Sequence, residues 1–106
     1  MIRCYRGVAR DNLHYPDALL GKAIPKGGPA SPAQHCRGDT ASKYTSWTTD
    51  REVAVEKALD SALGGRDVIL SKDFSETELI ASPDFYDESE VLVVGTVTDA
   101  NVEWVP

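Results

Sequence analysis

Strand-like segments lie on both sides of the most regular helical pattern in this chain. The pattern runs from about Asp50 to Leu63, begins with a capping box of Thr49 and Glu52, and ends at Gly64-Gly65. Its apolar residues recur with helical spacing, at Val55, Ala58, Leu59 and Ala62. Short runs typical of β-strands cover Ile2 to Val8, Val68 to Leu70, Glu78 to Ala81, Glu90 to Val97 and Asn101 to Val105. This order predicts an α+β fold of two small antiparallel sheets packed face to face, with the helix on one side.

The remaining chain divides into a second short helix and a long loop. Tyr15 to Ala23 is predicted to be helical, with Pro16 in its first turn and an apolar stripe of Leu19, Leu20 and Ala23. Ile24 to Lys43 is rich in glycine and proline, so we expect a loop. Loops of this length in compact domains are often functional.

Length and charge limit the classes of function. With 106 residues the chain is expected to form one domain, residues 1–106. It has no apolar stretch of the roughly 18 to 20 residues that cross a bilayer and no signal-peptide pattern, so we expect a soluble domain, made in a cytoplasm or forming the tail of a longer secreted protein. The net charge of −6 disfavours a nucleic-acid partner.

Cysteine and histidine usage does not favour a metal site. Cys4 and Cys36 are too few for a disulfide-rich scaffold, and we expect both to be free thiols. His14 and His35 stand alone, outside any metal-ligand spacing. The sequence therefore predicts no bound metal.

Three separated motifs contain residues suited to chemistry on a phosphorylated sugar. Arg6 and Gly7 end the first strand, and a guanidinium can bind phosphate or ribose oxygens with two donors. Ser46-Trp47-Thr48 ends a segment just before the main helix. Glu88 and Glu90 are two residues apart, so on an extended backbone both carboxylates share a face. Each motif alone is also compatible with an exposed arginine, a helix cap or a solvated acidic turn.

The order Arg-Gly, Ser-Trp-Thr and Glu-Ser-Glu resembles the signature of ADP-ribosyltransferases of the arginine, serine, glutamate type. Here Trp47 and Thr48 stand where that family has its middle threonine and second serine. More closely, the chain resembles the C-terminal toxin domains of bacterial polymorphic secreted proteins. The resemblance implies an ADP-ribosyltransferase-like split β-sandwich of two antiparallel sheets with flanking helices, and NAD as a substrate.

The resemblance also implies roles for individual residues. Glu90 would stabilise the ribosyl cation and Glu88 would orient or deprotonate the acceptor. Arg6, Gly7, Ser46 and Thr48 would bind NAD, while Phe85 and Trp47 would contact the substrate. Independently of the resemblance, the glycine-rich loop from Ile24 to Lys43 is expected to border the nucleotide, because such backbone can approach a ligand closely. His35 could assist there, although a surface histidine is the simpler interpretation.

The implied activity is mono-ADP-ribosylation of a target protein, with arginine as the favoured acceptor residue and nicotinamide as the product. The implied setting is a larger secreted toxin that acts in the cytoplasm of a target cell and has a cognate immunity protein as a further partner. Two alternatives stay open from the sequence: an NAD glycohydrolase that depletes NAD, and a non-catalytic binding module on the same fold.

Overall fold

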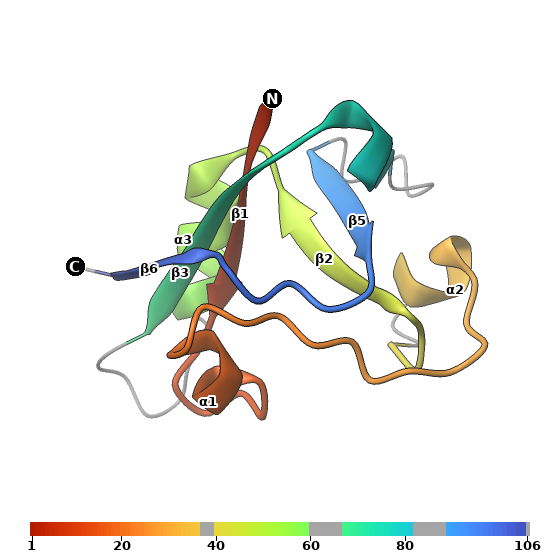
Figure 1. Cartoon of the computed structure of the whole chain (residues 1–106). Helices are drawn as coiled ribbons and strands as arrows, with labels where there is room; N and C mark the ends of the chain where they lie inside the picture. The colour runs from red at the N-terminus through yellow and green to blue at the C-terminus, as the bar shows by residue number, and fades with distance from the viewer. Residues whose placement is uncertain (37–39, 60–66, 82–88, 106) are drawn as a thin grey trace.

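In the part of the chain that the structure describes, six antiparallel strands form one sheet, and three short α-helices lie against or beside it (Figure 1). The computed structural model describes residues 1–36, 40–59, 67–81 and 89–105. The strands are β1 (Ile2–Val8), β2 (Tyr44–Thr48), β3 (Val68–Phe74), β4 (Leu79–Ala81), β5 (Glu90–Val94) and β6 (Asn101–Trp104). The helices are α1 (Tyr15–Ala18), α2 (Pro32–Cys36), α3 (Arg51–Leu59) and the 3-10 turn η1 (Glu76–Glu78). The α+β prediction is therefore confirmed.

The two central strands of the sheet, β1 and β2, are paired at a single position. In the strand order β4-β5-β2-β1-β3-β6, β1 and β2 pair at one position only, where Tyr5 faces Thr48. By contrast, β1 pairs with β3 from Ile2 to Val8, and β2 pairs with β5 from Tyr44 to Thr48. The prediction of two separate sheets is therefore wrong, because this one residue pair joins the strands into a single sheet of two halves.

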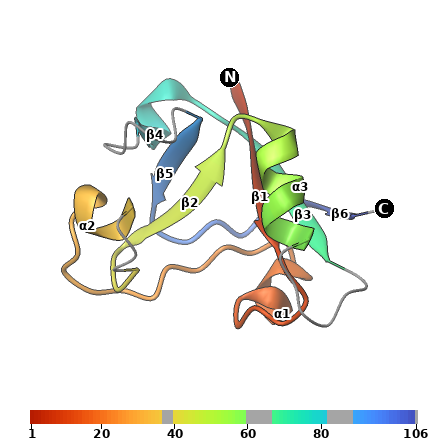
Figure 2. The ribbon, with the colours of Figure 1, turned by 180° about the vertical axis from the view of Figure 1, so that it is seen from behind.

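The two faces of β1 and β3 pack against different partners. Helix α3 covers one face, where Ala54 and Ala58 lie against Ile69 (Figure 2). The opposite face belongs to the main core, which also receives Trp47 from β2 and Ala18 from α1. Side chains alternate along these strands with the period of two expected for a sheet, so each strand contributes to both cores.

Gly7 allows α3 to approach β1 at backbone distance. A Cβ built on Gly7 would lie 1.9 Å from the backbone oxygen of Ala54 and 2.9 Å from the backbone nitrogen of Ala58. No side chain fits in that space unless the helix moves. The alanines on the facing side of α3 are buried for the same reason.

Helix α3 begins and packs differently from its prediction. Asp50, rather than Thr49, caps it, since the backbone N–H of Glu52 donates to Oδ1 of Asp50 at 3.0 Å. The expected apolar face is also wrong in part: Ala54 and Ala58 are buried, whereas Leu59 is 55% exposed. Small residues face the sheet because β1 lies so close. The predicted extension to Leu63 falls outside the described residues.

Two other elements are shorter than predicted, and each is followed by a turn at a glycine with positive φ. Helix α1 stops at Ala18 rather than Ala23, and the chain turns at Gly21, whose φ is 73°. Strand β5 stops at Val94, before Gly95 with a φ of 80°. Beyond these turns, the backbone of Ala23 pairs with that of Val97.

Among the described residues, no helix has both the length and the apolar character needed to cross a membrane. The thiol of Cys4 is buried and free. The side chain of Cys36 is not among those described.

The close approach at Gly7 predicts a large steric effect of a small substitution. We expect Gly7→Ala to lower the free energy of unfolding by about 3 kcal/mol, since the methyl group must displace helix backbone rather than a flexible side chain. Urea unfolding monitored by circular dichroism measures the change. Arg3→Ala, on the same strand, serves as the control because it removes only an exposed ion pair with Asp73 and should leave the midpoint almost unchanged. Equal midpoints for Gly7→Ala and the parent chain would contradict the packing described.

Candidate functional site

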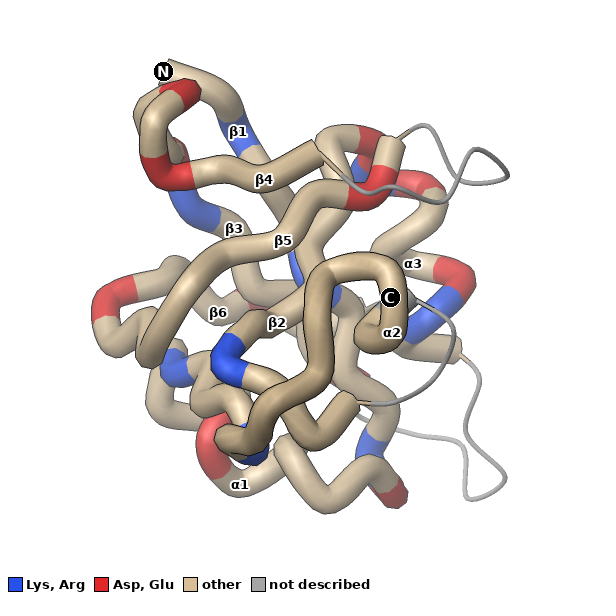
Figure 3. The backbone as a smooth tube through the Cα atoms, turned by 90° about the vertical axis from the view of Figure 1, so that its right-hand side faces the viewer, with Lys and Arg blue, Asp and Glu red and all other residues tan. Residues whose placement is uncertain are grey.

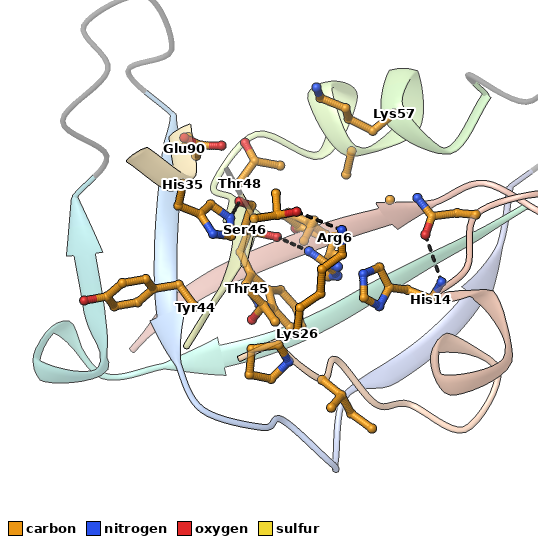
Figure 4. A pocket seen from close by; sticks show the side chains of 18 of the residues that line it. Arg6, His14, Lys26, His35, Tyr44, Thr45, Ser46, Thr48, Lys57 and Glu90 are labelled. Atoms are coloured by element: carbon orange, nitrogen blue, oxygen red, sulfur yellow. Dashed lines mark hydrogen bonds between the residues drawn. The ribbon is translucent and has the colours of Figure 1, made fainter. Parts of the chain in front are cut away.

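An open pocket of about 400 Å³ lies where β1 and β2 separate. Its walls come from β1, β2, the start of β5, α3, the turn before α1 and the loop that contains α2 (Figure 4). This volume lies within the range of small-molecule sites. The predicted site residues Arg6, Gly7, Ser46, Trp47, Thr48 and Glu90 all line it.

Arg6 bridges the gap between the two halves of the sheet. Its Nη1 donates to the backbone oxygen of Ser46 at 2.9 Å. The guanidinium thus takes the place of a strand N–H that an intact ladder would offer to this carbonyl. Its other N–H donors have no partner among the described residues and lie at the pocket.

Desolvation lowers the pKa of Arg6 to about 10. The guanidinium still carries its charge at neutral pH, although the fold stabilises that charge poorly. An anion in the pocket would supply the missing partner.

The Ser46 hydroxyl lies beside a buried histidine. Nε2 of His35 is 2.8 Å from Oγ of Ser46, and Nδ1 of His35 is 2.6 Å from Oγ of Ser42. The side chain of His35 is 7% exposed and that of Ser42 is fully buried. The interpretation of His35 as a surface residue is therefore wrong, because α2 folds back onto β2 and turns this ring inward.

Thr48 and Glu90 lie where the two halves of the sheet meet, beside the single Tyr5–Thr48 pair. They are paired in the register of β2 and β5, so both side chains lie on the same face as Ser46, two residues away (Figure 4). The Thr48 hydroxyl accepts the N–H of Asp50 at 3.1 Å and donates to Oγ of Ser89 at 3.2 Å. Thr48 therefore ties the start of α3 to the residue that precedes Glu90.

Trp47, predicted to contact the substrate, is largely a core residue. Trp47 lines the pocket wall, but its side chain is only 2% exposed. Its indole packs edge-on against Phe74, with ring centroids 5.2 Å apart, and its Nε1 donates to Oγ1 of Thr45. A core position thus accounts for Trp47, and a substrate contact stays a prediction. Glu88 and Phe85 lie outside the described residues.

The pocket is positively charged in an acidic protein. Its described lining has three cations (Arg6, Lys26 and Lys57) against one carboxylate (Glu90), a balance of +2, whereas the whole chain carries −6. Most acidic residues lie on turns and helices around the periphery (Figure 3). Burial, followed by the charges of Arg6 and Lys26, lowers the pKa of His14 at the pocket edge. The arrangement favours an anionic ligand.

Sequence analysis missed several contributors to this site. Lys26 and Ser42 come from loop segments and Lys57 from α3, and their spacing in the chain gives no pattern. His35, on α2, was considered as a possible helper, but its burial was not expected. The glycine and proline content of Ile24 to Lys43 was the available signal, since it marked this segment as a functional loop. The loop does border the pocket, through Ile24, Pro25, Lys26, His35 and Thr40.

No family model matches the chain, and no curated protein or solved structure matches it significantly. Among the described residues, no group of three or more histidine, cysteine or acidic side chains is arranged to hold a metal ion.

The N–H donors of Arg6 that open to the pocket predict a site for a diphosphate. We expect ADP-ribose to bind the parent chain and to bind Arg6→Gln at least about tenfold more weakly, since the substitution removes a charge-assisted, forked contact. Isothermal titration calorimetry at low and high salt measures this. Lys22→Gln removes the same charge outside the pocket and should change the affinity little. Equal losses of affinity in the two variants would show that the effect arises from net charge and not from a specific contact of Arg6.

Proposed function

We propose that this chain is a mono-ADP-ribosyltransferase that cleaves NAD and transfers ADP-ribose to a protein acceptor. One observation carries the proposal: Arg6, Ser46 and Glu90, one from each motif of the resemblance, line a single pocket from three adjacent strands. They are far apart in sequence, and a chance set of exposed residues would not be expected to meet in this way.

The charge of the pocket supports NAD as the ligand. Arg6, Lys26 and Lys57 can balance the pyrophosphate, whose two negative charges exceed what a neutral pocket would hold. Arg6 is the strongest candidate because its guanidinium is already desolvated and has free donors. Binding of the diphosphate would offset the cost of burying this cation.

Glu90 supplies the group that the chemistry requires. Breaking the bond between ribose and nicotinamide passes through a transition state with oxocarbenium character, which a nearby carboxylate stabilises. The bonding pair leaves with nicotinamide, and the acceptor then donates a pair to the ribose carbon and loses its proton. In this proposal Glu90 balances the positive charge and Glu88 serves the acceptor.

The setting of the proposed activity follows the same resemblance. The chain would act as part of a larger secreted toxin in the cytoplasm of a target cell, with a cognate immunity protein as an additional partner.

Glu90→Gln tests the catalytic role. The amide keeps size and hydrogen bonding but removes the negative charge, so NAD consumption should fall by about two orders of magnitude, roughly 3 kcal/mol of transition-state stabilisation, while NAD binding persists. Nicotinamide release from labelled NAD measures the rate, and calorimetry measures binding. Glu56→Gln, an exposed carboxylate of α3 outside the pocket, is the matched control. Near-normal turnover by Glu90→Gln would exclude this carboxylate from catalysis.

Glu88→Gln distinguishes transfer from hydrolysis. If Glu88 serves the acceptor, the variant should label proteins of a cell lysate less than the parent chain does, while its release of free ADP-ribose stays similar, because water needs less activation than an arginine side chain. The two products are separated after incubation with labelled NAD. Parallel losses of both would show that Glu88 does not act on the acceptor alone.

A further inference from the structure

The His35 side chain connects the loop that contains α2 to the pocket wall on β2. Its two ring nitrogens lie 2.6 Å from Oγ of Ser42 and 2.8 Å from Oγ of Ser46. The ring also meets Tyr44 edge-on, at 6.3 Å between centroids. Ring position and orientation are therefore fixed from three sides by β2 and the residues just before it.

The hydrogen bonds around Ser42 assign the tautomer of this ring. Oγ of Ser42 accepts the backbone N–H of Tyr44 at 3.2 Å, and Nδ1 of His35 is the acceptor within reach of its own hydroxyl proton among the described residues. A buried hydroxyl needs an acceptor, so Ser42 donates to Nδ1. The proton of the neutral imidazole then lies on Nε2.

This assignment gives the chain of hydrogen bonds one direction. The N–H of Tyr44 donates to Ser42, Ser42 donates to His35, and His35 donates through Nε2 to Oγ of Ser46. The Ser46 hydroxyl, which accepts from His35, is left to donate its own proton into the pocket. Bonds aligned in one direction polarise one another, so the last donor is strengthened.

Arg6 and His35 hold Ser46 from opposite ends. Arg6 binds its backbone oxygen at 2.9 Å and His35 binds its hydroxyl. In Figure 4 the three side chains meet at the centre of the pocket, with Glu90 beyond Ser46 and Thr48. The Ser46 hydroxyl therefore cannot turn to another partner without losing the contact to His35.

We propose that His35 is a positioning residue, which fixes the Ser46 hydroxyl as a hydrogen-bond donor to an oxygen of the bound NAD. This inference rests on the proposed function. In this proposal His35, although it also lines the pocket, acts on the bound NAD through Ser46, so its effect on turnover should disappear when Ser46 has no hydroxyl.

A pair of substitutions separates the two nitrogens of the ring. The amide of asparagine falls near the position of Nδ1 and can accept from Ser42, but it does not reach Ser46. The longer side chain of glutamine brings an amide N–H near the position of Nε2. We expect His35→Asn to reduce kcat for NAD consumption by about tenfold, the worth of one well-placed hydrogen bond, and His35→Gln to stay within about threefold of the parent chain.

The double variant distinguishes positioning of the Ser46 hydroxyl from a purely structural role of His35. In the Ser46→Ala background, His35→Asn should cause no further fall in kcat, because the hydroxyl that it positions is gone. Thermal midpoints of all variants are compared to separate turnover from folding. Equal rates for the two His35 variants, or additive losses in the double variant, would overturn the proposal.

Inactivity of the parent chain would contradict the proposed function itself and not only the role of His35. If the parent chain neither binds nor consumes NAD, the proposed function fails, and this inference fails with it. Should His35→Asn not fold, long-range proton–nitrogen NMR spectra of the parent chain decide the tautomer. A proton on Nε2 supports the proposal, and a proton on Nδ1 overturns it.

Discussion

The separation of β1 and β2 after the Tyr5–Thr48 pair is the constraint on which the pocket depends. An intact ladder would hold the strands about 4.8 Å apart and pair their backbones, leaving no space for a ligand. Here β1 follows β3 and α3, whereas β2 follows β5, so the two strands diverge beyond one shared position. The gap leaves the carbonyl of Ser46 to be satisfied by a side chain, and Arg6 provides the donor.

The use of the Arg6 guanidinium in place of a backbone N–H leaves a positive charge that an anionic ligand can balance. A guanidinium in the gap is desolvated, and its bond to one neutral carbonyl does not compensate a full charge. The charge therefore weakens the free protein and strengthens the complex with an anion. Helix α3 adds Lys57 on the same side, which it can do because Gly7 lets it pack against β1 at backbone distance.

Local sequence predicted most strands and the main helix but not α2, which lies within the segment expected to be a loop, and long-range packing decided where the elements end. Strand β1 was predicted from Ile2 to Val8 and is observed there, since its alternation is determined by its own residues. The cap at Asp50 and the exposed Leu59 could not be predicted, because both depend on how closely α3 meets the sheet. In the site, the meeting of Arg6, Ser46 and Glu90 was expected from the order of the motifs. The burial of His35 was not, because it requires the fold of a loop without periodicity.

The site combines residues held by strand register with residues that come from a loop. Arg6, Ser46 and Glu90 occupy strands, where register fixes their separation, and a change at one of them is not relieved by rotation of its neighbours. Lys26 and His35 come from the loop, which is tied within itself by the bond from Lys26 to Thr40 and to β2 by the bond of His35 to Ser46. The sheet register therefore fixes where these three side chains lie, and His35 connects the loop to that register. Because His35 connects the loop directly to Ser46, the orientation of that hydroxyl depends on the loop being seated.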